Sequence, residues 1–255
     1  MSQSSTITDA LTYPPVERFL HGLEIANLQL PDSEGQPLFH IGCWQMRPGV
    51  HWVHGTSGAG KTRLLRYLAS QNARQGDANT APRSAAQPNE ANAGPLAIGW
   101  HSPSAQPRPL SQKEVFFTEP EDPAWDPMTV GEVQAQLLAS GAQSACHLSA
   151  TSQARIQADL LAGFGLSPHL HKAMYMLSTG TRRKVFWLAA VLAPQPLVLL
   201  DEPSAALDQR SIHALHYALA LRNRIAQHQV TLVATAIEPQ DHGQIGRGHW
   251  RLDPS

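Results

Sequence analysis

Cysteine is scarce in this sequence, because only Cys43 and Cys146 occur among its 255 residues. They lie far apart and have no metal-ligand spacing, which excludes a disulfide framework and a zinc module built on paired cysteines. Such low cysteine usage is typical of a reducing compartment. We expect both residues to be ordinary thiols, buried or half-buried, without a chemical role.

An excess of charge of one sign is also absent. The chain carries 19 basic and 20 acidic residues, so its formal net charge is −1. The broad positive surface that holds nucleic acid or anionic lipid non-specifically is therefore not available. Aromatic residues do not interleave with basic ones, so no stacking platform for single strands is expected. The sequence predicts no nucleic-acid partner.

Long uninterrupted apolar runs are missing as well. The longest apolar tract, from Val185 to Leu200, contains Pro194 and Pro196, so it does not predict a membrane span. Residues 1–22 lack the basic and apolar parts of a secretory signal, and we expect a polar N-terminal tail there. The chain is expected to be soluble, although it can dock on a membrane protein.

Histidines are numerous but scattered. They suggest a metal site at two places, His51 with His54 and His169 with His171. Single histidines on strands and loops are usually structural or solvated, so we expect no zinc site at either place.

Apolar residues are plentiful, at 42% of the chain, which is enough for one large α/β domain. We expect residues 23–255 to form that domain. Within it, residues 71–95 are rich in Ala, Asn, Gln and Pro and predict a surface insertion. Residues from about 130 to 176 are mainly helical in pattern and predict a helical subdomain.

Strand and helix patterns alternate along the domain. Residues 23–30 alternate apolar and polar, as in a strand with one buried face, while residues 197–200 and 230–234 are apolar runs typical of buried parallel strands. Helical spacing is found at residues 182–192 and 211–227. This alternation predicts a mainly parallel sheet flanked by helices.

A glycine-rich loop, HGTSGAGKTR at residues 54–63, lies between the apolar residues 50–53 and a helical pattern at residues 62–68. It contains G-x-x-x-x-G-K-T, whose backbone amides wrap around phosphates. Lys61 is expected to reach the β- and γ-phosphates, and Thr62 to give its hydroxyl to Mg²⁺. The predicted nucleotide-binding residues of the loop are Gly55, Thr56, Ser57, Gly58, Ala59, Gly60, Lys61 and Thr62.

A second motif, Leu199-Leu200-Asp201-Glu202-Pro203, ends an apolar strand with two acids. Such a strand places Asp201 at the carboxyl edge of the sheet beside the loop, where it can hold Mg²⁺. Glu202 can then polarise the attacking water. We predict Lys61 and Glu202 as the catalytic residues, and Thr62 and Asp201 as the metal ligands.

A third motif, Leu177-Ser178-Thr179-Gly180-Thr181, precedes a helix and the Asp201 strand, and Ser204-Ala205-Ala206-Leu207-Asp208 follows that strand. With the glycine loop, this order resembles the nucleotide-binding domain of ATP-binding cassette (ABC) transporters. In that family the three elements are the LSGGQ signature, Walker B and the D-loop. The resemblance covers nearly the whole chain from about Leu23. It implies a P-loop NTPase fold with an antiparallel β edge and a helical signature subdomain.

The resemblance also implies roles and partners. Ser178 and Gly180 match signature positions that contact the γ-phosphate held by an opposite subunit, and Asp208 matches the D-loop acid that couples two sites. The family binds ATP and Mg²⁺ in a head-to-tail dimer that drives a separate membrane-spanning subunit. A cytoplasmic location, peripheral at the inner face of the plasma membrane, follows from the resemblance. The second nucleotide-binding subunit can be identical or different.

Several positions depart from the family pattern. Thr179 and Thr181 replace the usual Gly and Gln of the signature, which weakens it at most. Thr118 stands where the family has a glutamine that senses magnesium, and Ala236 where it has a histidine that grips the γ-phosphate. No adenine-stacking aromatic follows the first strand, around Pro31.

These departures predict that ATP binding outlasts efficient hydrolysis. Our main hypothesis is therefore a slow ATPase subunit of an ABC transporter, docking through the acidic segment 119–129, in which Trp125 is either exposed or locally packed. The alternative is a soluble ABC-type nucleotide switch or assembly factor. A small-molecule kinase would fit the glycine loop, but the signature and D-loop argue against it.

Overall fold

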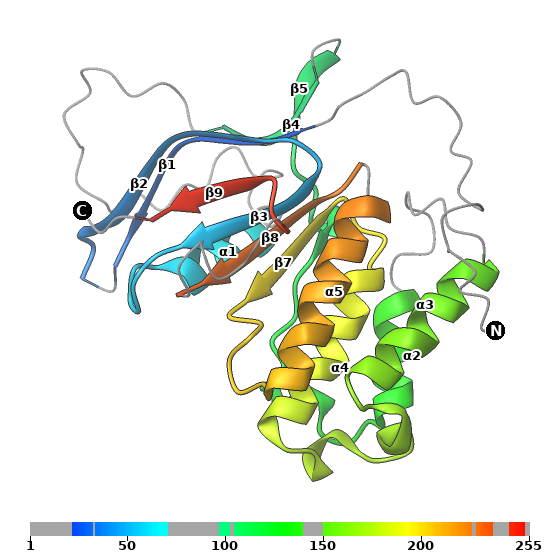
Figure 1. Ribbon diagram of the computed structural model, residues 1–255. Coiled ribbons are helices and arrows are strands. Elements are labelled where there is room, and N and C mark those ends of the chain that lie inside the picture. Colours follow the sequence, from blue (N-terminus) through cyan, green and yellow to red (C-terminus); the bar gives the residue numbers. More distant parts are fainter. Residues whose placement is uncertain are drawn as a thin grey trace, which may run out of the picture.

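The computed structural model describes residues 22–32, 34–70, 97–102, 105–139, 150–225, 228–236 and 245–252, which form two sheets and their covering helices (Figure 1). Apart from Gly22, the expected polar tail lies outside these ranges. The insertion expected at residues 71–95 and Cys146 lie outside them too.

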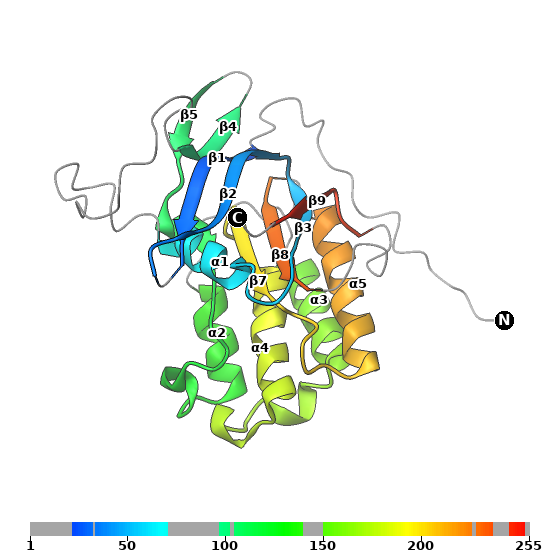
Figure 2. The same cartoon turned by 90° about the vertical axis from the view of Figure 1, so that its left-hand side faces the viewer.

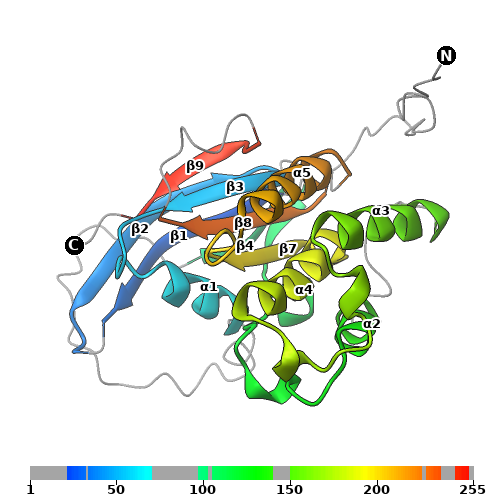
Figure 3. The ribbon, with the colours of Figure 1, turned by 60° about the horizontal axis from the view of Figure 1, so that its bottom comes forward.

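A five-stranded sheet, in which every neighbouring pair is parallel, has the order β6-β7-β8-β3-β9. Figure 3 shows β9, β3, β8 and β7 side by side. The strands are β3 (Gly49–His54), β6 (Val115–Phe116), β7 (Leu197–Asp201), β8 (Val230–Thr235) and β9 (Gly248–Arg251). The prediction of a mainly parallel sheet is confirmed.

The antiparallel part is a second sheet with the order β2-β1-β4-β5. Its strands are β1 (Gly22–Pro31), β2 (Pro37–Met46), β4 (Ala97–Ser102) and β5 (Ala105–Pro109). In β1 the buried residues are Leu23 and Ile25, then Leu28 and Leu30, so the alternation changes phase between the two pairs. The change coincides with Asn27, whose φ of 55° is left-handed. Asparagine tolerates this conformation better than most residues.

Helices cover the parallel sheet, and Figure 2 shows α2 to α5 at one end of the molecule and β4 and β5 at the other. The helices are α1 (Lys61–Ser70), α2 (Val130–Ala139), α3 (Ala150–Gly163), α4 (Thr179–Leu192) and α5 (Gln209–Ile225). Short 3₁₀ turns are found at Gln112–Glu114, Pro123–Trp125, Ser167–His169 and Met174–Met176. Within the described part of the chain, no helix has the length and apolarity that crossing a bilayer requires.

The two faces of the parallel sheet belong to two hydrophobic clusters. Leu197 and Leu199 of β7 pack with α1 and the antiparallel sheet, whereas Val198 and Leu200 pack with α4 and α5. Successive residues of a strand point to opposite faces, so a strand covered on both sides must be apolar throughout. Full burial of each such side chain contributes about 1.5–3 kcal/mol. This burial fixes the position of Asp201, the last residue of β7.

Two expectations about side chains are corrected or decided by the structure. Cys43 was expected to be buried or half-buried, but it is exposed on β2, whose outer face points away from the core. Trp125, left open between exposure and local packing, is packed locally. Its ring lies edge-on against Phe186 at a centroid distance of 5.4 Å.

Candidate active site

The glycine loop connects β3 to α1, and two of its glycines have left-handed backbone angles. Gly58 has φ 85° and Gly60 has φ 91°, a region that other residues rarely adopt. At position 60 a Cβ would also lie 2.5 Å from the Leu38 side chain and 2.7 Å from the Phe39 ring. The loop can therefore turn tightly into α1 only with glycine at position 60.

Lys61 is the first residue of α1, and its side chain folds back over the loop. Its Nζ donates to Gly55 O at 2.8 Å and to Thr56 O at 3.0 Å, and lies 3.3 Å from Glu202 Oε1. The side chain is only 6% exposed. A buried ammonium requires such partners, because an unpaired charge in the interior is strongly disfavoured. The loop thus presents one fixed positive charge at the helix N-terminus.

Thr62 and Asp201 meet directly. The Thr62 hydroxyl donates to Asp201 Oδ2 at 2.7 Å, while Asp201 Oδ1 is buried with no hydrogen-bond partner among the described residues. Burial raises the pKa of Asp201 and the neighbouring Glu202 charge adds to this, whereas the Thr62 hydrogen bond opposes it. An unpartnered carboxylate oxygen beside a hydroxyl is the hard-oxygen donor set that Mg²⁺ prefers. The pair therefore fits a magnesium ion.

Glu202 begins the turn after β7 with a left-handed φ of 41°. Its backbone N–H donates to Ala234 O at 2.9 Å, and its Oε2 accepts from the backbone N–H of Ala236 at 3.1 Å. Non-glycine residues in this conformation are uncommon and are often found at functional sites. The carboxylate is thus held at the site by Lys61 on one oxygen and a main-chain donor on the other.

Lys61, Thr62 and Glu202 line an open cleft of about 690 Å³. Its size is within the range of small-molecule and cofactor sites. The lining residues are Ser57, Gly58, Gly60, Lys61, Thr62, Arg63, Arg66, Glu202 and Ala236. Ala236 contributes a methyl group and a main-chain N–H where the family has a histidine. The cleft thus joins the glycine loop to the end of the Asp201 strand, as the two motifs predict.

A neighbouring cleft of about 680 Å³ is lined by Thr118, Glu119 and Asp201, among others. Arg66 of α1 pairs with Glu119, with Nε 2.6 Å from Oε1, and both side chains are exposed. Thr118 offers a hydroxyl in place of the longer amide of the family pattern. The residues after β6 therefore approach the site through an ion pair that the sequence did not predict.

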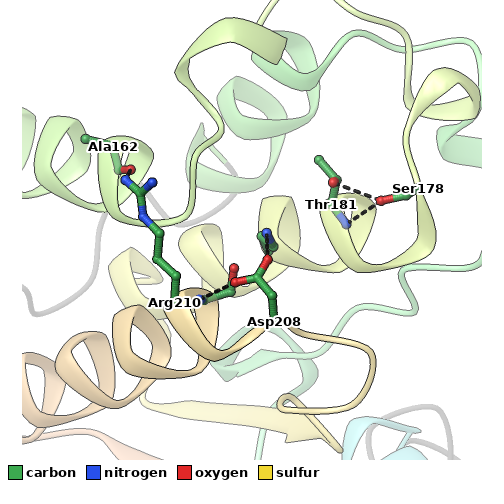
Figure 4. A network of polar contacts seen from close by, with 7 residues as sticks. Ala162, Ser178, Thr181, Asp208 and Arg210 are labelled. Atoms are coloured by element: carbon green, nitrogen blue, oxygen red, sulfur yellow. Dashed lines mark hydrogen bonds and ion pairs between the residues drawn. The ribbon is translucent and has the colours of Figure 1, made fainter.

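Ser178 caps α4, and Figure 4 shows its hydrogen bonds with Thr181. The Thr181 N–H donates to Ser178 Oγ at 3.2 Å, and Ser178 Oγ donates to Thr181 Oγ1 at 2.9 Å. The threonine that replaces the family's glutamine thus engages the serine hydroxyl locally. Gly180 lies so close to the D-loop that a Cβ would be 2.5 Å from Ala206 O.

Asp208 caps α5 in the same region (Figure 4). Its Oδ1 accepts from the Ser211 N–H at 2.8 Å, and its Oδ2 lies 3.3 Å from Lys184 Nζ. Hydrogen bonds from Ser211 lower the pKa of Asp208 to about 2, and Lys184 adds to the effect. Arg210, in the first turn of α5, donates from Nη2 to Ala162 O at 3.5 Å and so joins α5 to α3. Asp208 is therefore ionised and locally occupied.

Ser178, Gly180 and Asp208 do not line the cleft that contains Lys61 and Thr62. The chain therefore brings the glycine loop and the Asp201 motif together but keeps the signature apart from its own loop. Their roles in nucleotide binding stay predictions.

One part of this region, the strand β9, is not among the strands predicted from the sequence. It pairs with β3 and brings His249 to His54, with 3.0 Å between His249 Nδ1 and His54 Nε2. A four-residue strand that pairs with residues about 195 positions earlier has no local signature. The one feature of the sequence that points to this strand is Trp250, an apolar residue among polar neighbours.

Comparison with known proteins gives a consistent picture. The family profile described as "ABC transporter" matches residues 44–205. The cytochrome c biogenesis ATP-binding export protein CcmA of Paraburkholderia xenovorans is 30% identical over 180 residues, 66% of this chain and 71% of that protein.

An uncharacterised ABC transporter ATP-binding protein of Haemophilus influenzae is 31% identical over 186 residues, 71% of this chain and 63% of that protein. A solved structure of the ATP-binding subunit of an ABC transporter matches with a TM-score of 0.57 at 19% identity, covering 85% of this chain and 80% of that one. At that identity the likeness supports the fold alone.

Proposed function

This chain belongs to the ABC transporter family, and on that premise we propose that it is the ATP-binding subunit of a transporter, hydrolysing ATP slowly at a dimer interface. Members of the family are ATPases that bind ATP, normally with Mg²⁺, and generally work with membrane permease subunits. The separate membrane-spanning subunit, and a location at the inner face of the plasma membrane, are parts of the proposal.

The observation that supports the proposal best is the convergence of Lys61, Thr62, Asp201 and Glu202. Lys61 would neutralise the β- and γ-phosphates, and its contacts with two loop carbonyls and Glu202 would be exchanged for phosphate oxygens. Thr62 and Asp201 would hold Mg²⁺, which when bound supplies positive charge to the phosphate oxygens. Glu202 would orient and deprotonate the attacking water.

The slow rate follows from the groups around the γ-phosphate. Ala236 has no side-chain donor and Thr118 is shorter than glutamine, so neither can supply the contacts that the family pattern has there. The loss of one preorganised donor to a transition-state charge typically costs about 10²–10³ in rate. Binding depends instead on the loop and on Asp201, which are intact.

The dimer interface is proposed from the position of the signature. Ser178 is exposed and lies away from the cleft of its own chain. A second copy, or a related subunit, docked head to tail would bring its Ser178 and Gly180 to this chain's ATP, and the reverse. Asp208 would lie between the two sites. Thr181 must then release the Ser178 hydroxyl for the phosphate contact.

Turnover and binding together test this proposal. The purified chain should bind ATP, and its turnover should fall below the ordinary enzyme range of about 1–10³ s⁻¹. Glu202→Gln should keep ATP binding and lose the remaining turnover, because the amide preserves shape but cannot accept a proton. Full turnover in the wild type, or unchanged turnover in Glu202→Gln, would contradict the proposed site.

A second candidate, a soluble nucleotide switch, is favoured by the same Ala236 and Thr118. In it, ATP would control dimerisation and hydrolysis would be secondary. Purification of the tagged chain from detergent extracts distinguishes the two. A polytopic membrane protein retained in stoichiometric amount supports the transporter, whereas ATP-dependent dimerisation without such a protein supports the switch.

A further inference from the structure

A second, smaller cavity lies beside the start of the glycine loop. It has a volume of about 130 Å³ and is lined by Gly55 and Thr56 of the loop, by Ala236, and by residues at the ends of β3 and β9. Ala236 lines both cavities. The volume is about four times that of a water molecule in the liquid, so the cavity admits a small ion and no nucleotide.

The lining of this cavity is basic. His54, His249 and Arg251 contribute to it, and no acidic residue does so among the described part of the chain. In the parallel pairing of β3 with β9, His54 is the register partner of Arg251. Glu202, whose Oε2 accepts from the N–H of the lining residue Ala236, is also paired with Lys61. The charge of the cavity therefore favours an anion.

The two histidines form a stacked pair. Their ring centroids are 5.2 Å apart with 16° between the planes, and Nε2 of His54 lies 3.0 Å from Nδ1 of His249. In the neutral pair one ring donates this hydrogen bond and the other accepts it. Uptake of a single proton preserves the bond, because the charged ring becomes the donor. In the protonated pair, Nε2 of His249 carries a hydrogen whichever of the two rings donates the shared hydrogen bond. It can therefore donate to a ligand.

A metal ion is a less suitable occupant of the pair. Two imidazoles supply only two ligands, and a structural metal site normally has four. No group of three or more His, Cys, Asp or Glu residues that could hold a metal is found within the described ranges.

We propose that this cavity binds one small tetrahedral oxyanion, such as inorganic phosphate, between Arg251 and the His54/His249 pair, and that binding brings one proton to the pair. Arginine matches the geometry of such an ion with two parallel hydrogen bonds, and His249 adds a third donor. The site is separate from the nucleotide cleft and does not depend on ATP hydrolysis.

Other charged groups face the pair from the elements around it. They are His51 on β3, Arg247 before β9 and Arg251 on β9. Lys61 and Glu202 contact residues that line the cavity, through Gly55 O and the Ala236 N–H.

The test uses sulfate as the probe, because sulfate does not titrate between about pH 5 and pH 8, where histidine does. Sulfate is titrated by calorimetry into the full chain carrying Lys61→Ala, which weakens the binding of phosphate-like ions at the nucleotide loop. Measurement in two buffers with different ionisation enthalpies gives the number of protons taken up. Inorganic phosphate is then tested as a competitor, and chloride at equal ionic strength as a control.

Saturable sulfate binding with uptake of up to one proton per ion is expected, with displacement by phosphate. Arg251→Gln and His249→Gln should each weaken binding about tenfold or more, as the loss of a charge-assisted hydrogen bond does. His249→Gln should also reduce the proton uptake, because it removes one of the two rings that share the proton. Both side chains are exposed, so these variants should fold. Arg224→Gln, which removes an exposed arginine of α5, is the matched control and should bind sulfate normally.

Several results would overturn the proposal. They are absence of saturable binding, an equal effect of chloride, failure of phosphate to displace sulfate, or equal weakening by Arg224→Gln. Binding without proton uptake would also overturn it, since the histidine pair would then not take part.

Discussion

The two sides of the nucleotide cleft differ in how many side chains converge on it. On the side of the glycine loop and β7, Lys61 has three partners within 3.3 Å, and Thr62 is bonded to Asp201 at 2.7 Å. On the side of the loops after β6 and β8, Ala236 provides one main-chain N–H, and Thr118, which lines the neighbouring cleft, provides one hydroxyl. The first side is dense in side-chain contacts, and the second is sparse.

This difference teaches that binding and cleavage of a nucleotide can be separated along one sheet edge. The dense side depends on β3 and β7, whose positions are fixed by burial on both faces. The sparse side depends on loops, where a single substitution removes a donor without disturbing the core. Four predictions test this difference between the two sides, in order of decreasing expected effect.

Lys61→Ala breaks the dense side. Loss of a charge-assisted contact to phosphate costs about 1.5–3 kcal/mol per hydrogen bond, so ATP affinity should fall about 10²-fold. Titration of a fluorescent ATP analogue measures it. The control is Arg63→Ala, which removes an exposed positive charge from the same cleft and should change affinity far less. Equal losses would mean that net charge alone holds the nucleotide.

Gly60→Ala and Gly58→Ala test the scaffold of the dense side. Both positions have left-handed φ, but a Cβ at position 60 meets Leu38 and Phe39, whereas at position 58 it meets open space. We expect destabilisation of about 1 kcal/mol at position 58 and about 3 kcal/mol at position 60, measured by urea unfolding. Equal effects would show that close packing around Gly60 contributes nothing.

Ala236→His repairs the sparse side. A histidine there would restore a donor to the γ-phosphate, and turnover should rise at least about tenfold, with little change in ATP affinity. Steady-state phosphate release measures it. Ala236→Leu, of similar bulk but without a donor, should give no rise. If neither variant is faster, the defect lies at Thr118 or in the dimer.

The fourth prediction concerns His51, which lies in β3. Its protonation at lower pH should slightly lower the free energy of unfolding. His51 Nε2 lies 2.6 Å from Arg47 O, and Trp250 Nε1 donates to its Nδ1 at 3.3 Å, so the ring is neutral. Burial lowers its pKa, an effect partly opposed by the Arg47 hydrogen bond, with Arg247 and His249 lowering it further.

The folded-state pKa of His51 is therefore below the unfolded value of about 6.5. Its contribution to stability is fully present above that value and is lost as the pH falls toward the folded-state pKa. One proton limits the slope to about 1.4 kcal/mol per pH unit. Urea midpoints at several pH values should show a flatter dependence for His51→Gln and no flattening for His40→Gln, at an exposed position of β2.

Much of this molecule could be predicted from the sequence. The glycine loop, the apolar residues 197–200 and the acids after them have local signatures, since phosphate binding and double-sided burial each require particular residue types in a row. Helices α4 and α5 also follow from spacing and from Pro194. The antiparallel edge was expected from the family resemblance, although its strand β2 was not located.

The rest depends on contacts between distant segments. In β2 the apolar positions change phase near Gly42, together with the change at Asn27 in β1, so neither strand alternates strictly. The pairing of His54 with His249 and the Arg66 to Glu119 ion pair join residues 195 and 53 positions apart. The hydrogen bond between the hydroxyls of Ser178 and Thr181 depends on side-chain rotamers, which a sequence pattern does not specify.

The main-chain donor on Glu202 has a consequence for how this sequence can drift. Because the N–H of residue 236 holds the carboxylate, every amino acid except proline at that position offers the same hydrogen bond. The position of the Glu202 carboxylate therefore does not depend on which side chain residue 236 carries. A lineage could exchange the residue at 236 freely, losing or regaining catalytic speed, without ever having to rebuild the turn that carries the base.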